Sequence, residues 1–195
     1  MIILGLTGSI GMGKSTTAQM FRDEGCPVFD ADAAVHSLYA KGGKAVPIIK
    51  AVFPDAIKDG AVDRAVLGQH MRADPIDLKV LESFIHPLVS ESREVFFKNH
   101  KDADIVVMDI PLLIETGLDK AVHHVVVVTA PFKVQRERVL AREGMSVDLF
   151  DSLLSRQTPD QEKRKRADFL IFTDKGLENA REQVQKILRE LRLKT

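Results

Sequence analysis

The chain has 195 residues, a length that predicts one compact unit, or one core with a small insertion, rather than two independent domains. Hydrophobic residues make up 45% and charged residues 29%, which is enough apolar material for a core and ordinary for a globular protein. Lysine plus arginine (28) balance aspartate plus glutamate (28), so the chain has no net positive field that would attract nucleic acid or an anionic membrane.

The single cysteine, Cys26, cannot form an intramolecular disulfide, so we expect a reducing, cytoplasmic location and exclude a disulfide-bonded secreted scaffold. The longest apolar runs, such as 125–130, are far shorter than the roughly 18 residues of a membrane-spanning helix. The first residues lack the basic flank and cleavage site of a signal peptide. We therefore expect a protein that binds neither nucleic acid nor membrane, while its oligomeric state stays open.

Five short apolar runs predict buried strands, at 2–6, 28–29, 105–108, 125–128 and 170–172. Helical stretches lie between them, and the first of these, 15–24, is expected to end at Gly25. The last helix has apolar residues at a spacing of three or four, namely Leu177, Ala180, Val184, Ile187, Leu188 and Leu191. Continuous apolar strands separated by amphipathic helices predict an α/β fold with a parallel sheet covered on both faces.

Two stretches interrupt this alternation. The first, 32–102, has helical patterns and no convincing buried strand, and His86-Pro87 is expected to end one helix and start another. The second, 133–166, is polar and helical, with Thr158 expected to cap a helix that starts at Pro159. We predict a single unit with both stretches inserted over the carboxyl edge of the sheet, the core consisting of 1–31, 103–132 and 167–195.

Residues 8–15 read G-S-I-G-M-G-K-S, a complete G-x-x-x-x-G-K-S motif between a predicted strand and a predicted helix. The glycines let the backbone curl so that successive N–H groups point at an anion, and the helix N-terminus adds partial positive charge. Lys14 supplies an ammonium group for the β- and γ-phosphates, and the Ser15 hydroxyl is a hard oxygen ligand for Mg²⁺. The motif predicts binding of a nucleoside triphosphate.

The rest of the chain favours a kinase over a guanine-nucleotide switch. A switch would need an N-K-x-D element, and the nearest fragment, 173–176, lacks the asparagine. Two helical insertions are typical of a small-molecule kinase, because phosphoryl transfer to an acceptor other than water needs an acceptor pocket and a closing lid. Two alternatives stay open: a nucleoside or nucleotide kinase of the same fold, and an ATP-gated regulator without transferase activity.

Aspartates follow two of the predicted strands. Asp30 and Asp32 follow the second, where one carboxylate could orient and deprotonate an acceptor hydroxyl, or both could be helix N-caps. Asp109 closes the strand 105–108, where it could hold a metal-bound water or could simply belong to a turn.

Arginines in the second insertion are candidates for binding the polyphosphate. Arg138 and Arg142 lie one helical turn apart, and Arg164 is a third candidate. The other basic residues considered there are expected to be solvated: Arg136, Lys163, Lys165 and Arg166.

Six short motifs, in order along the chain, resemble those of the dephospho-coenzyme A kinase family, and the resemblance covers essentially the whole length. They are L-T-G-x-I-G-x-G-K-S at 6–15, D-A-D at 30–32, D-R-x-x-L at 63–67, H-P-L at 86–88, P-L-L-x-E at 111–115 and Q-x-x-R-x-x-x-R at 135–142. Gln157, Arg164 and the Ala167-Asp168 pair follow. The chain departs from the family at 171–176, where many members have I-x-N-x-G near the adenine, so the adenine contacts stay unassigned.

The resemblance implies transfer of the γ-phosphoryl group of ATP to the ribose 3′-hydroxyl of dephospho-coenzyme A, with Mg²⁺. It implies an adenylate-kinase-like P-loop fold with a five-stranded sheet, a helical coenzyme-binding domain at 32–102 and a lid at 133–166. Asp32 is then the base, and Lys14 and Arg138 act with it in catalysis.

The same resemblance and the phosphate-loop motif give three sets of site residues. ATP would be bound by Gly8, Gly11, Met12, Gly13, Lys14, Ser15, Thr16, Arg138 and Arg142. The acceptor would be bound by Asp32, Arg64, His86, Pro87, Leu112, Leu113 and Glu115. The metal ligands would be Ser15 and Asp109. None of these assignments covers the pantetheine arm of the acceptor.

Overall fold

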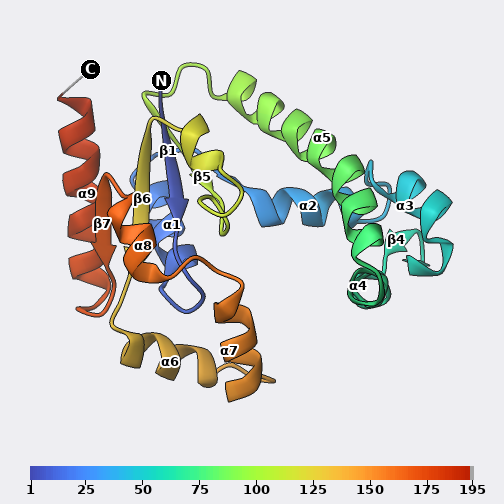
Figure 1. Cartoon of the computed structure of the whole chain (residues 1–195). Coiled ribbons are helices and arrows are strands. Elements are labelled where there is room, and N and C mark those ends of the chain that lie inside the picture. The colour runs from blue at the N-terminus through green and yellow to red at the C-terminus, as the bar shows by residue number, and fades with distance from the viewer. Residues whose placement is uncertain (194–195) are drawn as a thin grey trace. The chain divides into compact units, whose positions relative to one another are not determined.

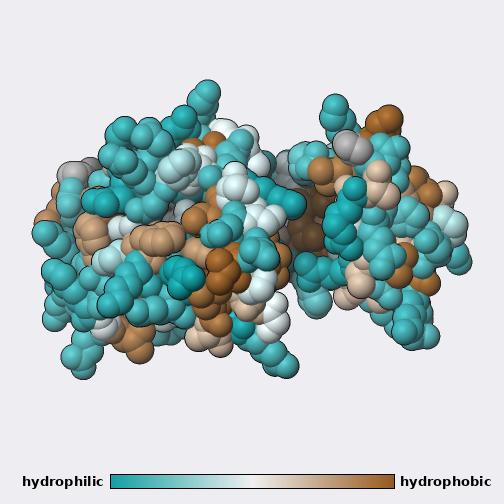
Figure 2. Space-filling view, turned by 60° about the horizontal axis from the view of Figure 1, so that its bottom comes forward, coloured by the Kyte–Doolittle hydropathy of each residue, from teal (hydrophilic) through white to brown (hydrophobic). Residues whose placement is uncertain are grey.

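The computed structural model describes residues 1–193 and divides into two compact units (Figure 1). The first, called the core unit here, comprises Met1–Phe29 and Asp102–Thr195. The second, called the helical unit, comprises Asp30–Lys101. Within residues 1–193, none of the helices is both long and apolar enough to cross a membrane. On the face drawn in Figure 2, hydrophilic side chains predominate and apolar ones form smaller patches between them.

A five-stranded sheet in the order β2-β5-β1-β6-β7 organises the core unit. β1 pairs in parallel with β5 and β6, and β6 pairs in parallel with β7. Val106 and Val107 are neighbours on β5 and so point to opposite faces of the sheet, and both are fully buried, as expected for a strand covered on both faces. The predicted parallel α/β fold is thus confirmed. The strands are β1 (Ile2–Thr7), β2 (Val28–Asp30), β5 (Ile105–Asp109), β6 (His124–Thr129) and β7 (Phe169–Phe172).

Helices α1 (Lys14–Asp23) and α9 (Leu177–Arg192) pack together against one face of the sheet, and Figure 1 shows α9 alongside β7. The predicted apolar series of α9 is buried, with one exception. Leu177 is 68% exposed because it is the first residue of the helix and borders a cavity described below. Gly25 ends α1 as expected: with φ +85° it lets the Cys26 N–H reach the Phe21 carbonyl, closing a Schellman motif.

The other face of the sheet is covered by the loop that follows β5 and by α8 (Asp160–Lys165). Gly5 of β1 shows how closely the loop packs, because a Cβ there would lie 2.6 Å from a methyl carbon of Leu113. This loop contains the short 3₁₀ helix η2 (Leu118–Ala121).

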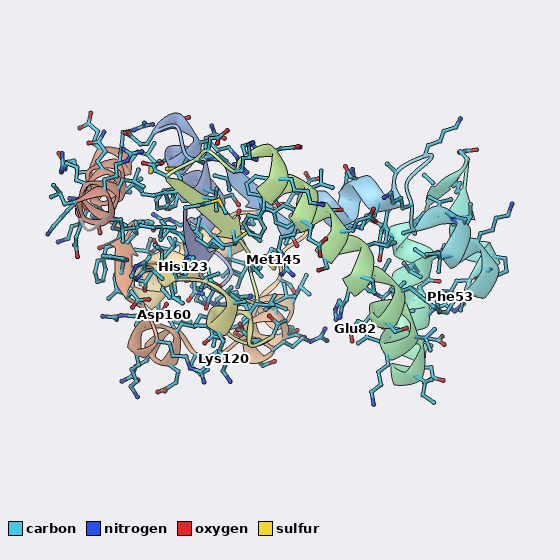
Figure 3. All side chains as sticks on the ribbon, turned by 90° about the horizontal axis from the view of Figure 1, so that it is seen from above. Phe53, Glu82, Lys120, His123, Met145 and Asp160 are labelled. Atoms are coloured by element: carbon cyan, nitrogen blue, oxygen red, sulfur yellow. The ribbon has the colours of Figure 1, made fainter. Side chains whose placement is uncertain are left out.

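Three helices make up the polar insertion of the core unit: α6 (Phe132–Leu140), α7 (Val147–Ser155) and α8. The expected cap of α8 is wrong. The N-cap position is Pro159, which has no side-chain cap, and α8 begins at Asp160, the residue labelled in Figure 3. Thr158 lies before the helix because its N–H donates to the Glu115 carboxylate instead (2.7 Å).

The helical unit has its own apolar core, built around residues such as Leu38, Ile49 and Phe53, the last of which is labelled in Figure 3. Its elements are α2 (Ala31–Tyr39), α3 (Val46–Val52), η1 (Pro54–Ala56), β3 (Ile57–Lys58), β4 (Ala61–Val62), α4 (Arg64–Ala73) and α5 (Pro75–Asn99).

Two features of the helical unit differ from the prediction. β3 and β4 form an antiparallel hairpin whose turn, Asp59-Gly60, has positive φ at both residues. Strands of two residues are too short to produce a recognisable alternation. The second difference is that α5 continues through Pro87. Apolar residues on both sides of the proline, including Ile85 and Leu88, pack on the same cluster, so tertiary packing compensates for the backbone hydrogen bond that proline cannot make.

Candidate active site

The phosphate-loop motif forms the turn between β1 and α1. Gly11 and Gly13 have φ of +80° and +93°, a region that only glycine adopts readily. Gly8 is required for another reason, since a Cβ there would lie 2.7 Å from the carbonyl oxygen of Val128. No side chain caps the N-terminus of α1, so the N–H groups of its first turn are available to an anion.

Lys14 and Asp109, which the sequence places 95 residues apart, form an ion pair in which Lys14 Nζ donates to Asp109 Oδ1. The register explains the contact: Asp109 ends β5 and pairs with Leu6 of β1, one residue before Thr7 closes that strand. Both side chains are largely buried. The predicted phosphate-binding lysine and the predicted metal carboxylate therefore meet at the same edge of the sheet.

A cavity of about 300 Å³ adjoins the phosphate loop. Its lining combines glycines of the loop, the first turns of α1, two arginines of the polar insertion and the start of α9. These residues are Gly11, Gly13, Thr16, Thr17, Met20, Arg138, Arg142, Thr173, Gly176, Leu177 and Ala180. The cavity thus brings together loop residues and the two arginines that the sequence singled out for ATP. Arg164, the third candidate, lies instead over the ring of Phe172, 5.6 Å from its centroid.

Thr173 fixes Arg138 beside the loop. The guanidinium donates to the Thr173 hydroxyl and to the Thr173 carbonyl, both at 2.8 Å. The same hydroxyl donates to the carbonyl of Met12 in the phosphate loop, also at 2.8 Å. The sequence drew attention to position 173 only as the start of a fragment that lacks the asparagine of N-K-x-D and as part of a departure from the family pattern, and it indicated no role for the side chain.

Two glutamines of the polar insertion hold the backbone of Ile10 through its carbonyl and its N–H. Gln135 Nε2 donates to the Ile10 carbonyl (2.7 Å), and the Ile10 N–H donates to Gln157 Oε1 (3.0 Å). Gln135 is only 2% exposed. Both glutamines belong to motifs that resemble the family's, but the sequence gave no sign that their partner is the phosphate loop.

Glu115 contacts the segment that leads into α8. Its Oε1 accepts from the Thr158 N–H and lies 2.8 Å from Lys163 Nζ. Burial by itself raises the pKa of the Glu115 carboxyl, but the Lys163 ammonium group beside it and the hydrogen bond from the Thr158 N–H outweigh burial and hold that pKa below its usual value. Lys163 is fully buried, so the expectation that it is solvated is wrong. The reason is its ion pair, which α8 brings under the loop after β5.

In the helical unit, the two aspartates after β2 have different surroundings. The Asp30 carboxylate accepts from the Ala33 N–H (2.9 Å) and is the N-cap of α2. Asp32 is exposed in the first turn of the same helix. The sequence left open whether both aspartates cap a helix. Only Asp30 does so, and the Asp32 carboxylate is not part of the α2 cap.

The remaining acceptor candidates of the helical unit lie on two helices. Arg64 is the exposed first residue of α4, directly after Asp63, which caps that helix. His86 is exposed on α5, next to Pro87. In the core unit, Leu112 is 41% exposed and Leu113 is fully buried.

Comparison with known proteins decides the family. A family model described as "Dephospho-CoA kinase" matches residues 2–179. The chain belongs to the dephospho-CoA kinase family. A dephospho-CoA kinase of Mesorhizobium japonicum is 54% identical over 98% of both chains. Another, from Ruegeria pomeroyi, is 53% identical over 97% of this chain and 95% of that one. The family resemblance predicted from the six motifs is therefore confirmed.

Solved structures agree with the family's fold. A crystal structure from Thermus thermophilus, described as TT1252, superposes with a TM-score of 0.82 at 35% identity, covering 97% of each chain. A dephospho-CoA kinase from Campylobacter jejuni gives 0.67 at 23% identity, and a shikimate kinase from Aquifex aeolicus gives 0.52 at 20%. The last two matches show the fold alone. The predicted P-loop kinase fold is confirmed.

Proposed function

We propose that the chain transfers the γ-phosphoryl group of ATP to the ribose 3′-hydroxyl of dephospho-coenzyme A, giving coenzyme A and ADP. The observation that carries the proposal is the cavity in which the phosphate loop meets Arg138 and Arg142. Membership of the dephospho-CoA kinase family supports the choice of acceptor.

The ATP polyphosphate would lie over the phosphate loop, bound by backbone N–H groups and by the first turn of α1. Lys14 would exchange its Asp109 partner for the β- and γ-phosphate oxygens. Arg138 and Arg142 supply guanidinium groups for the charge that spreads over the phosphoryl oxygens during transfer. Met12 and Thr16 are the remaining residues proposed to bind ATP. Met12 contributes backbone to the phosphate loop, and Thr16 lines the cavity.

The residues expected to hold Mg²⁺ fit that ion. The Ser15 side chain is exposed in the first turn of α1, and the Asp109 carboxylate lies at the adjoining strand end, so both donors are hard oxygens. Within residues 1–193 there is no cluster of three His, Cys, Asp or Glu side chains suited to a metal, which agrees with an ion held chiefly by phosphate oxygens and water. When bound, Mg²⁺ neutralises charge on the β- and γ-phosphates.

We assign Asp32 as the residue that orients the acceptor hydroxyl and takes its proton late in the transfer. The support is its place two residues after β2 and its absence from the α2 cap, which Asp30 supplies. Arg64, His86, Pro87, Leu112, Leu113 and Glu115 are the proposed acceptor-binding residues. We also propose that 32–102 is the acceptor-binding insertion and 133–166 is the lid.

An assay of ADP release tests the proposal. Dephospho-coenzyme A should stimulate ATP turnover far more than AMP or uridine does. Stronger stimulation by AMP or uridine would instead favour a nucleotide or nucleoside kinase. No stimulation by any acceptor would favour an ATP-gated regulator, and either of these two results overturns the proposed reaction.

A further inference from the structure

We propose that Lys163 is a positioning residue: through Glu115 it holds the segment that carries Gln157 against the phosphate loop. The inference rests on the proposed function in one respect, which is that the phosphate loop binds ATP. It gives a role to a lysine that does not line the cavity containing Arg138 and Arg142.

The burial of Lys163 is the starting observation. Its side chain has no exposed surface, and a buried ammonium group is costly unless it is paired with an opposite charge. The pairing atom is Glu115 Oε1, 2.8 Å away, on the loop that follows β5. Glu115 Oε2 and Lys163 Nζ are both buried and have no hydrogen-bond partner among the described residues, so the two charges compensate one another as an ion pair through Oε1. Each member of this pair therefore fixes the position of the other.

A short series of contacts leads from the ion pair to the phosphate loop. Glu115 Oε1 also accepts from the Thr158 N–H at 2.7 Å. The preceding residue in the chain is Gln157, whose Oε1 accepts from the Ile10 N–H at 3.0 Å. Because one peptide bond joins Gln157 to Thr158, a shift of Glu115 would move the side chain that holds Ile10. Gln135 holds the Ile10 carbonyl from α6, so Gln157 provides one of two points of support.

The N-terminal end of α8 has a separate attachment, which keeps the proposed effect of Lys163 local. The Asp160 carboxylate, at the start of α8 in Figure 3, accepts from the Thr129 hydroxyl at the end of β6 (2.8 Å). Near the other end, Arg166 lies 3.6 Å from Asp119. Loss of the Lys163 charge would therefore leave α8 attached and would chiefly release Glu115, the Thr158 N–H and, with them, Gln157.

The expected consequence is weaker ATP binding. In Lys163→Met, the Glu115 carboxylate becomes an unpaired, partly buried charge and turns toward water, so the Thr158 N–H loses its acceptor. Gln157 is then free to shift, and the phosphate loop must be ordered by the ligand, which lowers affinity. We expect the ATP dissociation constant to rise about tenfold, within the range of coupling between neighbouring residues.

Calorimetric titration of ATP into four proteins tests this: wild type, Lys163→Met, Gln157→Ala and the double variant. If Lys163 acts through Gln157, the double variant binds ATP no more weakly than Gln157→Ala does. If the two substitutions instead weaken ATP binding independently, so that their effects on the dissociation constant multiply in the double variant, Lys163 contributes only to general stability and the proposal is overturned. The matched control is Lys165→Met on the same helix, an exposed lysine paired with Glu162, which should bind ATP as the wild type does.

Folding of each variant is checked by circular dichroism, because Lys163→Met leaves a charge without its partner. Should that variant not fold, Glu115→Ala/Lys163→Met removes both charges and also the acceptor of the Thr158 N–H. It must then show weakened ATP binding and the same lack of additivity with Gln157→Ala, and wild-type affinity would contradict the proposal. Failure of the proposed reaction would appear separately, as wild-type protein that binds ATP without phosphorylating dephospho-coenzyme A.

Discussion

The phosphate loop and the polar insertion at 133–166 both contribute to the candidate ATP site, yet their residues are specified in different ways. In the loop, consecutive residues such as Gly13, Lys14 and Ser15 have roles that follow from their own spacing and backbone geometry. In the insertion, Arg138, Gln157 and Lys163 all lie on or beside polar helices, and their partners are 35, 147 and 48 residues away.

This difference shows where the role of a residue can be inferred from the neighbouring sequence and where it cannot. A phosphate loop binds an anion through the N–H groups of adjacent residues, so one stretch of sequence contains nearly the whole phosphate-binding site. A lid works by bringing side chains to a site made elsewhere. Its residues therefore depend on long-range contacts, and one lysine can be solvated while another on the same helix, two residues away, is fully buried.

The largest effect expected from the loop is that of Lys14→Ala. Removal of the ammonium group leaves the phosphates without their main positive side chain and leaves Asp109 buried without the lysine partner. We expect turnover to fall about a thousandfold or more, together with a marked loss of ATP affinity. Steady-state kinetics and ATP titration check both, and retained ATP affinity would contradict the proposed role.

Asp32→Asn should separate catalysis from nucleotide binding. The substitution keeps the size of the side chain and removes its ability to accept a proton, and Asp30 still caps α2. We expect kcat to fall by roughly 10² to 10⁴-fold with ATP affinity unchanged. Near-native kcat would exclude Asp32 as the base.

A substitution with a smaller expected effect tests the long-range contacts of the polar insertion, the proposed lid. Thr173→Val keeps the shape of the side chain but removes the hydroxyl that joins Arg138 to Met12. We expect kcat/KM for ATP to fall about fivefold to tenfold, in keeping with the loss of hydrogen bonds that include one to a charged group. Thr173→Ser retains the hydroxyl and serves as the control.

The same pair of positions can be tested for dependence on one another. In an Arg138→Ala background, the valine substitution at 173 should have little further effect, because the guanidinium that the hydroxyl holds is already absent. Equal effects in both backgrounds would show that Thr173 acts independently of Arg138.

The smallest expected effect concerns the pH dependence of stability. The Lys163 ammonium group and the Thr158 N–H hold the pKa of Glu115 below the ordinary value of 4.5, so the unfolded chain takes up this proton first as pH falls. The resulting stabilisation is complete above about pH 4.5 and is lost as pH falls through the lower, folded-state pKa.

Urea unfolding of wild type and Glu115→Gln between pH 6 and pH 3 measures this contribution. The free energy of unfolding should decrease more steeply with acidification in the wild type than in the variant, because the variant lacks the carboxyl group whose proton uptake differs between the folded and unfolded chains. Identical slopes would show that the folded protein does not lower the pKa of Glu115.

Much of the fold was predictable because its signals are local. All five buried strands were located from apolar runs, and the end of α1 was located from Gly25. The failures have an equally physical cause. Pro87 lies inside α5 because packing on both sides outweighs the local preference to break, and the β3–β4 hairpin is too short to show a pattern.

For the candidate site, residue identity alone specified the phosphate loop: three glycines that permit its curvature, a lysine for phosphate and a hydroxyl for a metal ion. Position after a strand and helical spacing made Asp30, Asp32, Arg138 and Arg142 candidates, and family resemblance then selected Asp32 as the base. Only the tertiary structure decided that Thr173 holds Arg138, that two glutamines hold Ile10 and that Lys163 is buried against Glu115. Each of these contacts joins segments that are far apart in the chain, and a side chain's partner across such a distance is set by the packing of the whole unit.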